Sequence, residues 1–180
     1  MASDSRPLIK TRPAVFPDDK DVVGKLFLAY AESLPISLEF QNFKHEFASL
    51  PGKYTIENGG DLYLAYIALP ASHVSPAAEQ IVGCVCLRAF AAPKSCELKR
   101  LYLTPESRGL GASKLLMDVV IASARKLGYE EMLLDTLSSM TAAMKLYVRY
   151  GFVEIDAYYE SVPDAVFYRL DLQDRERGLR

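Results

Sequence analysis

The chain has 180 residues and a formal net charge of −2 at pH 7, and half of its residues are hydrophobic. That length fits one domain, and the apolar content can form a buried core and argues against intrinsic disorder. The near balance of charge argues against a nucleic-acid-binding protein with a globally basic surface. No apolar run reaches the ~18 residues of a membrane helix, and residues 1–7 lack the apolar stretch of a signal peptide. We therefore expect a cytoplasmic protein without membrane or nucleic-acid partners.

The three cysteines are Cys84, Cys86 and Cys96. An odd and sparse count does not indicate a disulfide framework. Cys84 and Cys86 stand two apart in an apolar run, so they would share one face of a strand. A Cys-x-Cys zinc site is a weak alternative, because the chain has only two histidines. We expect buried, reduced thiols, as in cytosolic proteins, and no metal site.

The first half of the chain predicts strands and helices separated by proline and glycine. Helical spacing after Pro17-Asp18-Asp19 indicates a helix that Pro35 ends, and Pro51-Gly52 would end the next one. Residues 70–80, with two prolines, are typical of a long surface loop. In chain order we expect a strand over 8–12, helices over 18–34 and 39–50, and strands over 62–69 and 81–90.

The second half alternates strands and helices. Gly128 and Gly151 stand where helices end, and Ser138 or Ser139 could begin the last helix. In chain order we expect a strand over 96–103, a turn over 104–107, a helix to about 127, a strand over 131–136, a helix to 150, and strands over 152–157 and 165–172. Together these elements predict a mixed α/β fold with one sheet and helices on both faces. We expect a single domain over 1–180, with its core at 8–172 and tails at 1–7 and 173–180.

A glycine-rich segment after the strand over 96–103 carries the clearest chemistry. Gly109 and Gly111 allow close approach of the backbone to a ligand, and the free N–H groups of the following helix attract an anion. Arg108 adds positive charge, so we expect a phosphate or pyrophosphate group here. The Walker A pattern fails because Ser113-Lys114-Leu115 stands at its end, and G-x-G-x-x-G fails at Lys114. A plain turn into a helix remains the alternative.

The spacing Arg108-x-x-Gly111-x-Ser113 resembles the Arg/Gln-x-x-Gly-x-Gly/Ala signature of the GCN5-related N-acetyltransferase (GNAT) superfamily. Residues 97–103 resemble the fourth strand of that family. Residues 143–152 resemble its late A-x-x-x-Y-x-x-x-G-F motif, which joins a helix to a strand. Each motif alone is weak, but their order along the chain is specific.

The resemblance covers residues 8–172 and has two departures. Ser113 replaces the last Gly/Ala of the signature, and Met140 stands where the family often has an asparagine that contacts the cofactor. Residues 50–54 are similar to a segment of uncharacterised microbial members of the family, which narrows the branch without naming a substrate.

The resemblance implies one strongly twisted, mostly antiparallel sheet of six to seven strands whose fourth and fifth strands splay apart. It implies acetyl-CoA as cosubstrate, with the pantetheine arm between those strands and no metal. The backbone of Leu101 and Leu103 would pair with the acetyl carbonyl and the pantetheine amides, and the N–H groups from Arg108 to Lys114 would hold the pyrophosphate. The expected cofactor-binding residues are Leu101, Tyr102, Leu103, Arg108, Gly109, Leu110, Gly111, Ala112, Ser113 and Lys114.

The implied reaction is direct transfer of an acetyl group from the thioester to an amine. By the resemblance, Tyr147 is the general acid and Glu97 is a candidate base, since the amine must lose a proton before it attacks. Asp135 or a chain of water molecules is the alternative base. Regular alternation would place Glu97 on the face of its strand that also carries Lys99, Leu101 and Leu103, and a bulge would alter this.

The first two helices and the last hairpin should form the walls of the acceptor-binding site. We expect a small-molecule primary amine, with a protein N-terminus or lysine, or a non-catalytic acyl-CoA-binding module, as the alternatives. Family members are often dimers, so a homodimer is a candidate assembly. The polar residues expected on the acceptor side are Glu39, Gln41, His45, Glu46, Tyr54, Tyr158 and Tyr159.

Overall fold

The structure is a computed structural model that describes residues 7–69, 78–90 and 94–173. Most of the two predicted tails, and residues 70–77 of the predicted loop, lie outside the described residues. The elements are β1 (Ile9–Pro13), α1 (Lys20–Glu32), η1 (Glu39–Gln41), α2 (Phe43–Ala48), η2 (Gly52–Tyr54), η3 (Ile56–Asn58), β2 (Asp61–Leu69), β3 (Ala78–Ala89), β4 (Ser95–Leu103), η4 (Pro105–Ser107), α3 (Ala112–Lys126), β5 (Glu131–Leu137), α4 (Thr141–Arg149), β6 (Val153–Ile155) and β7 (Ala165–Asp171), where η denotes a short 3-10 helix.

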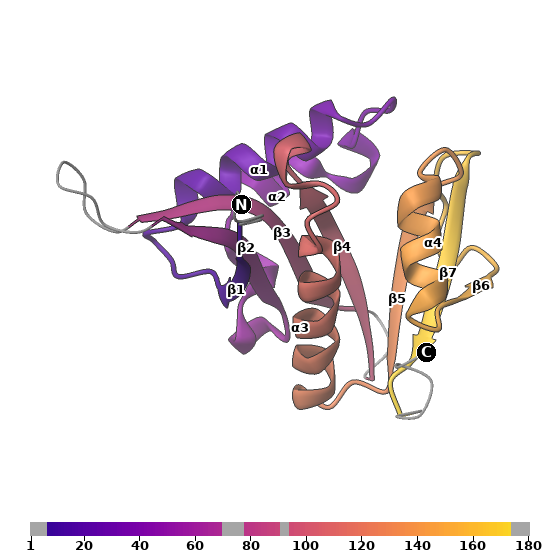
Figure 1. The fold of residues 1–180 in the computed structure, drawn as a ribbon. Coiled ribbons are helices and arrows are strands. Elements are labelled where there is room, and N and C mark those ends of the chain that lie inside the picture. The colour runs from indigo at the N-terminus through magenta and orange to yellow at the C-terminus, as the bar shows by residue number, and fades with distance from the viewer. Residues whose placement is uncertain (1–6, 70–77, 91–93, 174–180) are drawn as a thin grey trace, which may run out of the picture.

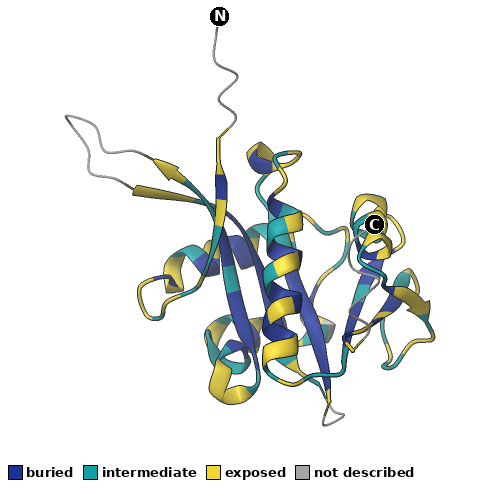
Figure 2. Cartoon of the chain, turned by 60° about the horizontal axis from the view of Figure 1, so that its bottom comes forward, coloured by how far each residue is buried: buried dark blue, intermediate teal, exposed yellow. Residues whose placement is uncertain are grey.

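The described strands form one seven-stranded sheet in the order β1-β2-β3-β4-β5-β7-β6. Every neighbouring pair is antiparallel except β4 and β5, which are parallel. Helices α3 and α4 pack on one face of the sheet, and α1 and α2 pack on the other (Figure 1). The central strands are therefore covered on both sides, while α3 keeps an exposed outer stripe (Figure 2). The predicted mixed fold with helices on both faces is confirmed.

Two predictions for the helices are wrong. The predicted helix over 39–50 breaks at Asn42, which adopts a left-handed conformation with φ 57° between η1 and α2; asparagine tolerates that conformation better than most residues. Helix α4 begins at Thr141, and no side chain caps it. Neither Ser138 nor Ser139 serves as its cap, because Met140 occupies that position.

Strands β4 and β5 are paired along only part of their length. The pairing joins residues 95–97 to residues 131–133, but β4 continues to Leu103 and β5 to Leu137. Beyond Glu97 the two strands diverge, as Figure 1 shows. The predicted splay of the fourth and fifth strands is therefore present.

A β-bulge lies in β4 just beyond the point of divergence. Lys99 is opposite Cys86 and Tyr102 is opposite Cys84, so one more residue lies between them on β4 than on β3. Arg100 has φ 55° there, and its carbonyl accepts a hydrogen bond from the Cys84 thiol at 3.4 Å. The extra residue inverts the alternation of side chains.

The bulge overturns the predicted arrangement of side chains on β4. Leu101 packs in the core beneath α3 and α4, as does Leu103. Lys99 and Glu97 are opposite Cys86 and Arg88 and lie on the other face of the sheet. The prediction that Glu97, Lys99, Leu101 and Leu103 share one face is therefore wrong.

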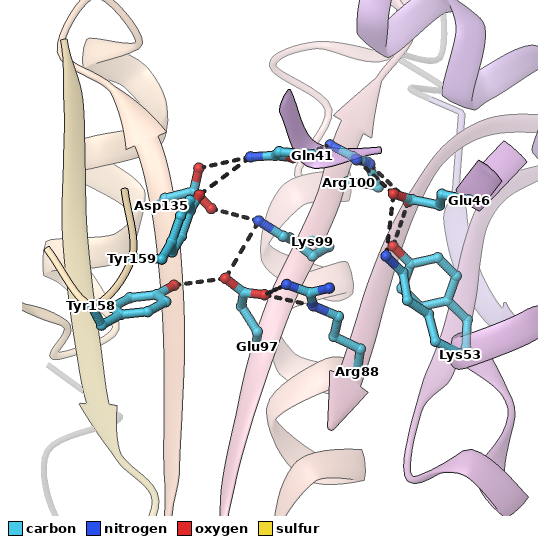
Figure 3. A network of polar contacts seen from close by, with 11 residues as sticks. Gln41, Glu46, Lys53, Arg88, Glu97, Lys99, Arg100, Asp135, Tyr158 and Tyr159 are labelled. Carbon is cyan, nitrogen blue, oxygen red and sulfur yellow. Dashed lines mark hydrogen bonds and ion pairs between the residues drawn. The ribbon is translucent and has the colours of Figure 1, made fainter. Parts of the chain in front are cut away.

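The side chain of Arg100 is buried and fully engaged. Its Nη2 and Nε atoms donate to the Glu46 carboxylate at 2.7 and 3.0 Å, and Nη1 donates to Gln41 Oε1 at 3.0 Å. The guanidinium also lies 5.5 Å from the ring centroids of Tyr30 and Phe43. These contacts hold a non-glycine residue in a backbone conformation that costs free energy. Figure 3 shows how they join α2 and η1 to β4.

Gly83 on β3 is opposite Leu103 on β4. A Cβ atom there would lie 2.5 Å from Leu103 Cδ2 and 2.6 Å from the Tyr102 carbonyl oxygen. We predict that Gly83→Ala lowers the free energy of unfolding by about 1–3 kcal/mol, because β4 must shift to make room. Urea denaturation measures the change. Gly24→Ala is the control, because its Cβ would meet Phe47 at an ordinary 3.4 Å and should leave stability unchanged or slightly higher. Equal stability of the two variants would contradict the prediction.

Glu46 supplies the second prediction. Burial alone would raise the pKa of this carboxyl, but the Arg100 guanidinium outweighs burial and lowers the pKa to about 2 from 4.5. A group with a lowered pKa in the folded state stabilises the fold above its unfolded pKa and ceases to do so as the pH falls. Glu46→Gln should therefore cost about 3–5 kcal/mol at pH 7, and the difference should shrink between pH 4.5 and 2.

Urea titrations across that pH range provide the measurement. Glu39→Gln is the matched control, since Glu39 forms only an exposed pair with Lys44 at 3.7 Å and should change stability by less than about 1 kcal/mol. A deficit for Glu46→Gln that stays constant with pH would rule out the ion pair as its cause.

Candidate active site

A cavity lies where β4 and β5 diverge. Its wall comes from β4, β5, α1, η1 and α4, so it is built by segments that are distant in the sequence. The lining residues are Tyr30, Gln41, Leu98, Lys99, Arg100, Leu101, Asp135, Thr136, Met140 and Tyr147. The described residues contain no group of three or more His, Cys, Asp or Glu side chains that could hold a metal ion, and none of their helices is long and apolar enough to cross a membrane.

Tyr147 lies in this cavity beside Leu101. Helix α4 presents its ring to the core, 5.7 Å from the ring centroid of Phe152 and 6.2 Å from that of Tyr168. Burial raises the pKa of Tyr147 above its usual value, so the phenol is protonated at neutral pH. The structure thus brings together the predicted acid and the predicted backbone contact of the acetyl group, and it leaves the tyrosine with a proton to donate.

Glu97 lies at the last paired position before the strands part, and it is fully buried. Its carboxylate accepts hydrogen bonds from Arg88 Nε at 2.6 Å and from the Tyr158 hydroxyl at 2.7 Å, and Lys99 Nζ lies 3.4 Å away. Glu97 is not among the described residues that line the cavity. Its contacts therefore engage both carboxylate oxygens, and the ion pair with Lys99 connects it to the cavity lining.

Lys99 and Asp135 form an ion pair across the gap between β4 and β5. Lys99 Nζ donates to Asp135 Oδ1 at 2.6 Å, and both residues line the cavity (Figure 3). Burial by itself would raise the pKa of Asp135, but the Lys99 ammonium outweighs it and lowers that pKa. Asp135 is therefore ionised at neutral pH. Sequence reasoning named Asp135 but missed its partner, although a lysine in a buried strand is unusual enough to have been a signal.

Gln41 connects β4 to β5 across the gap between them. Its Nε2 group donates to Asp135 Oδ2 at 3.2 Å and to the Tyr159 hydroxyl at 3.3 Å, while its Oε1 atom accepts from Arg100. The broken segment η1–α2 makes this possible, because it directs Gln41 and Glu46 toward the same strand (Figure 3).

The other expected acceptor-side residues separate into two groups. Tyr158 and Tyr159 pack edge-to-face on Phe167 at 5.0 and 5.2 Å, forming an aromatic wall beside Glu97 and Asp135. Tyr54 bonds to Glu46 rather than facing the cavity. The structure leaves Glu39 and His45 exposed and outside the cavity lining.

The predicted anion site lies at the start of α3. Gly109 and Gly111 have φ 80° and 85°, and a Cβ atom at either would meet nothing within 4 Å, so this side of the turn is open. Gly111 precedes the helix, and the N–H groups of Ala112 and Ser113 have no partner within it. The N–H groups of Arg108, Leu110 and Lys114, also predicted to bind the pyrophosphate, instead donate to backbone carbonyls. The Ala112 and Ser113 donors and the exposed Arg108 and Lys114 fit a diphosphate.

Of the remaining predicted cofactor-binding residues, the side chains of Leu110, Ala112 and Ser113 adjoin these donors and that of Tyr102 does not. Ala112 is buried and Ser113 is half-buried in the first turn of α3, and Leu110 packs against the core. Tyr102 packs edge-to-face on Tyr30 on the opposite face of β4, with centroids 6.2 Å apart. The Tyr150 hydroxyl lies 3.0 Å from the Lys114 carbonyl oxygen and thereby ties α4 to this turn.

Comparisons with known proteins agree with this geometry. The model of the acetyltransferase (GNAT) family matches residues 39–152. An uncharacterised N-acetyltransferase of Schizosaccharomyces pombe is 37% identical over 87% of this chain and 90% of its own. Another, from Dictyostelium discoideum, is 32% identical over 85% of this chain and 94% of its own.

Solved structures show the same fold. An acetyltransferase of the GNAT family from Staphylococcus aureus superposes with a TM-score of 0.69 at 20% identity, covering 92% of this chain and 99% of that one. An acetyltransferase from Salmonella typhimurium, solved with its cofactor acetyl-CoA, gives a TM-score of 0.64 at 15% identity, covering 94% and 97%. With the family match and these relatives, the chain belongs to the acetyltransferase (GNAT) family and is an acyltransferase.

Proposed function

We propose that the protein is an acetyl-CoA-dependent N-acetyltransferase that transfers an acetyl group to the primary amine of a small molecule. The observation that carries this proposal is the cavity where β4 and β5 diverge, which is lined by Leu101, Tyr147 and the Lys99–Asp135 pair. Gln41 bridges the cavity. A bridged cavity suits a small acceptor, whereas a protein tail would need an open groove.

The chain offers acetyl-CoA two binding features. The glycine turn and the first turn of α3, over 108–114, would hold the diphosphate. The part of β4 that β5 leaves unpaired, including Leu101 and Leu103, would hold the pantetheine arm through its backbone. When bound, acetyl-CoA supplies a thioester carbonyl as the acyl donor.

The bulge in β4 would stabilise the charge that develops on that carbonyl. Leu101 lies in the bulge, and neither it nor Arg100 has a partner residue in the β3–β4 register. Its N–H group would donate to the carbonyl oxygen, a kind of contact whose loss typically slows a reaction about 10²–10³-fold. Tyr147 would donate its proton to the departing thiolate.

The contacts of the two candidate carboxylates favour the water chain as the route by which the amine loses its proton. Glu97 is paired with Arg88, and Asp135 is paired with Lys99 and has a lowered pKa. The lowered pKa makes Asp135 a weak base, and the Glu97 carboxylate is engaged outside the cavity lining. We assign Glu97 a structural role in holding Lys99 and Tyr158, and Asp135 the role of orienting the amine.

A cytoplasmic location is part of the proposal. All three cysteines are free and buried, which agrees with the predicted burial and suits a reducing compartment.

The first test is a search for acetylated products. Purified protein is incubated with acetyl-CoA and separate pools of monoamines, polyamines, amino acids and short peptides, and products are identified by mass spectrometry. A product in a small-molecule pool supports the proposal. Acetylated peptides alone would replace it with protein acetylation. Tight binding of acetyl-CoA without any product would favour a binding module.

Tyr147→Phe removes the proposed proton donor and keeps the ring. We predict that kcat falls about 10²–10⁴-fold while the Kd for acetyl-CoA, measured by calorimetry, stays the same. Tyr168→Phe is the control, because it makes the same change in the same core without facing the cavity. Loss of kcat in both variants, or in neither, would exclude the acid role of Tyr147.

The pH dependence tests the water route. Because the pKa of Asp135 is lowered by Lys99, Asp135 stays ionised throughout the neutral range. We predict that kcat/KM rises with pH and levels off above the pKa of the acceptor amine. The midpoint of this rise should therefore shift by about one unit between acceptors whose amine pKa values differ by about one unit. A midpoint near pH 5–6 that is independent of the acceptor would instead identify a carboxylate as the base.

A further inference from the structure

The amide of Gln41 has a defined orientation inside the cavity. Its oxygen accepts from Arg100 Nη1 at 3.0 Å, and its nitrogen donates to Asp135 Oδ2 at 3.2 Å. The chemistry of the two partners dictates this orientation, because a guanidinium only donates and a carboxylate only accepts. All three side chains line the cavity that contains Leu101 and Tyr147. The cavity thus has one position suited to an acceptor oxygen and, beside it, one suited to a donor nitrogen.

An α-amino carboxylate presents the same pair of groups. Its carboxylate oxygen accepts and its ammonium donates, and the two are separated by only one bond more than the oxygen and nitrogen of an amide. Such a ligand would take the place of the Gln41 amide between Arg100 and Asp135, and the Gln41 side chain would have to turn away from them. Its amine would then lie beside Asp135, in the same cavity as the Leu101 backbone and the Tyr147 hydroxyl.

The charges around the cavity select against more cationic acceptors. Lys99 and Arg100 line it along with a single carboxylate, Asp135, which Lys99 already neutralises. Glu46 and Glu97 are paired with Arg100 and Arg88 outside the lining. A polyamine would bring several charges without a free carboxylate to pair with them, which is costly in a buried site. A zwitterion brings its own compensating charge.

A second, narrow cavity with a largely apolar wall adjoins the first. It shares Tyr30, Gln41, Asp135, Thr136 and Met140 with the first. Its other lining residues are apolar, namely Leu34, Ile36, Leu38, Leu137 and Val162. A side chain that leaves the α-carbon between Arg100 and Asp135 would meet this apolar wall, whose residues would have to move apart to admit it.

We propose that the acceptor is an α-amino carboxylate with an apolar side chain, bound with its carboxylate toward Arg100, its amine toward Asp135 and its side chain among Leu34, Leu38 and Val162. This inference rests on the proposed N-acetyltransferase function and specifies its substrate. In the reaction the amine nitrogen, after losing one proton to water, forms a bond to the acetyl carbon, and it loses a second proton to water as the neutral amide forms. The carbon–sulfur bond of the thioester breaks, and the thiolate takes the proton of Tyr147, which is then restored from solvent.

The test compares leucine with 3-methylbutylamine, which is leucine without its carboxylate, and with spermidine. Because the two monoamines differ in pKa, kcat/KM is measured across pH and expressed per free amine. We expect leucine to exceed 3-methylbutylamine by at least about tenfold on this scale, as in sites that hydrogen-bond a substrate group, and spermidine to be the poorest acceptor.

Gln41→Glu tests the position of the carboxylate. It places a negative charge beside Arg100, so the preference for leucine over 3-methylbutylamine should fall at least about tenfold, mainly through KM for leucine. Glu39→Gln, an exposed change in the same short helix, should leave the preference as it is. Thermal unfolding and calorimetry with CoA verify that the Gln41→Glu variant is folded and binds the cofactor.

The outcomes separate the two proposals. A preference for leucine that Gln41→Glu weakens supports the α-amino carboxylate. Equal or better use of 3-methylbutylamine or spermidine overturns this substrate class and leaves N-acetyl transfer to small amines standing. The absence of product from every amine, amino acid and peptide, with CoA bound, overturns the proposed function itself.

Discussion

The buried guanidinium of Arg100 organises the rest of the site. It lies at a bulge in β4 with a left-handed backbone, and the Glu46 carboxylate, the Gln41 amide and two aromatic rings surround it. Without these contacts a regular strand would be more stable, because the left-handed conformation costs a non-glycine residue free energy. A regular strand would turn Leu101 to the same face as Lys99. The Arg100–Glu46 ion pair therefore determines which side chains and which backbone groups of β4 face the cavity.

The divergence of β4 and β5 has its own physical consequence. Beyond Glu97, side-chain contacts replace the backbone hydrogen bonds between the two strands, chiefly Lys99–Asp135 and Gln41–Asp135. Backbone groups of a buried strand require partners, so the unpaired part of β4 is suited to an extended ligand that adds to the sheet. Under the proposed function, the gap that would bind such a ligand also opens the cavity beside it, which would place donor and acceptor next to each other.

The same ion pairs bear on how the site can catalyse. Each of the two carboxylates, Glu97 and Asp135, is held in position by a cation, and the lowered pKa of Asp135 makes it a weak base. Under the proposed function, the site would act through orientation, through the backbone donor in the bulge and through a protonated tyrosine. The acceptor amine would then attack the thioester once it has lost a proton, without a protein side chain acting as base.

Local signals determined much of this protein from sequence alone. Apolar runs bounded by proline and glycine located the strands of the sheet, because burial on both faces leaves a continuous apolar pattern. The glycines at 109 and 111, and the order of the motifs up to Tyr147, indicated the family and the anion site. Tertiary structure decided the rest. The face to which Leu101 turns depends on register against β3. The contacts of Glu97 depend on Arg88 from the neighbouring strand, and the positions of Glu46 and Gln41 depend on Arg100. These features arise from contacts between segments that are distant in the chain, and no local pattern encodes them.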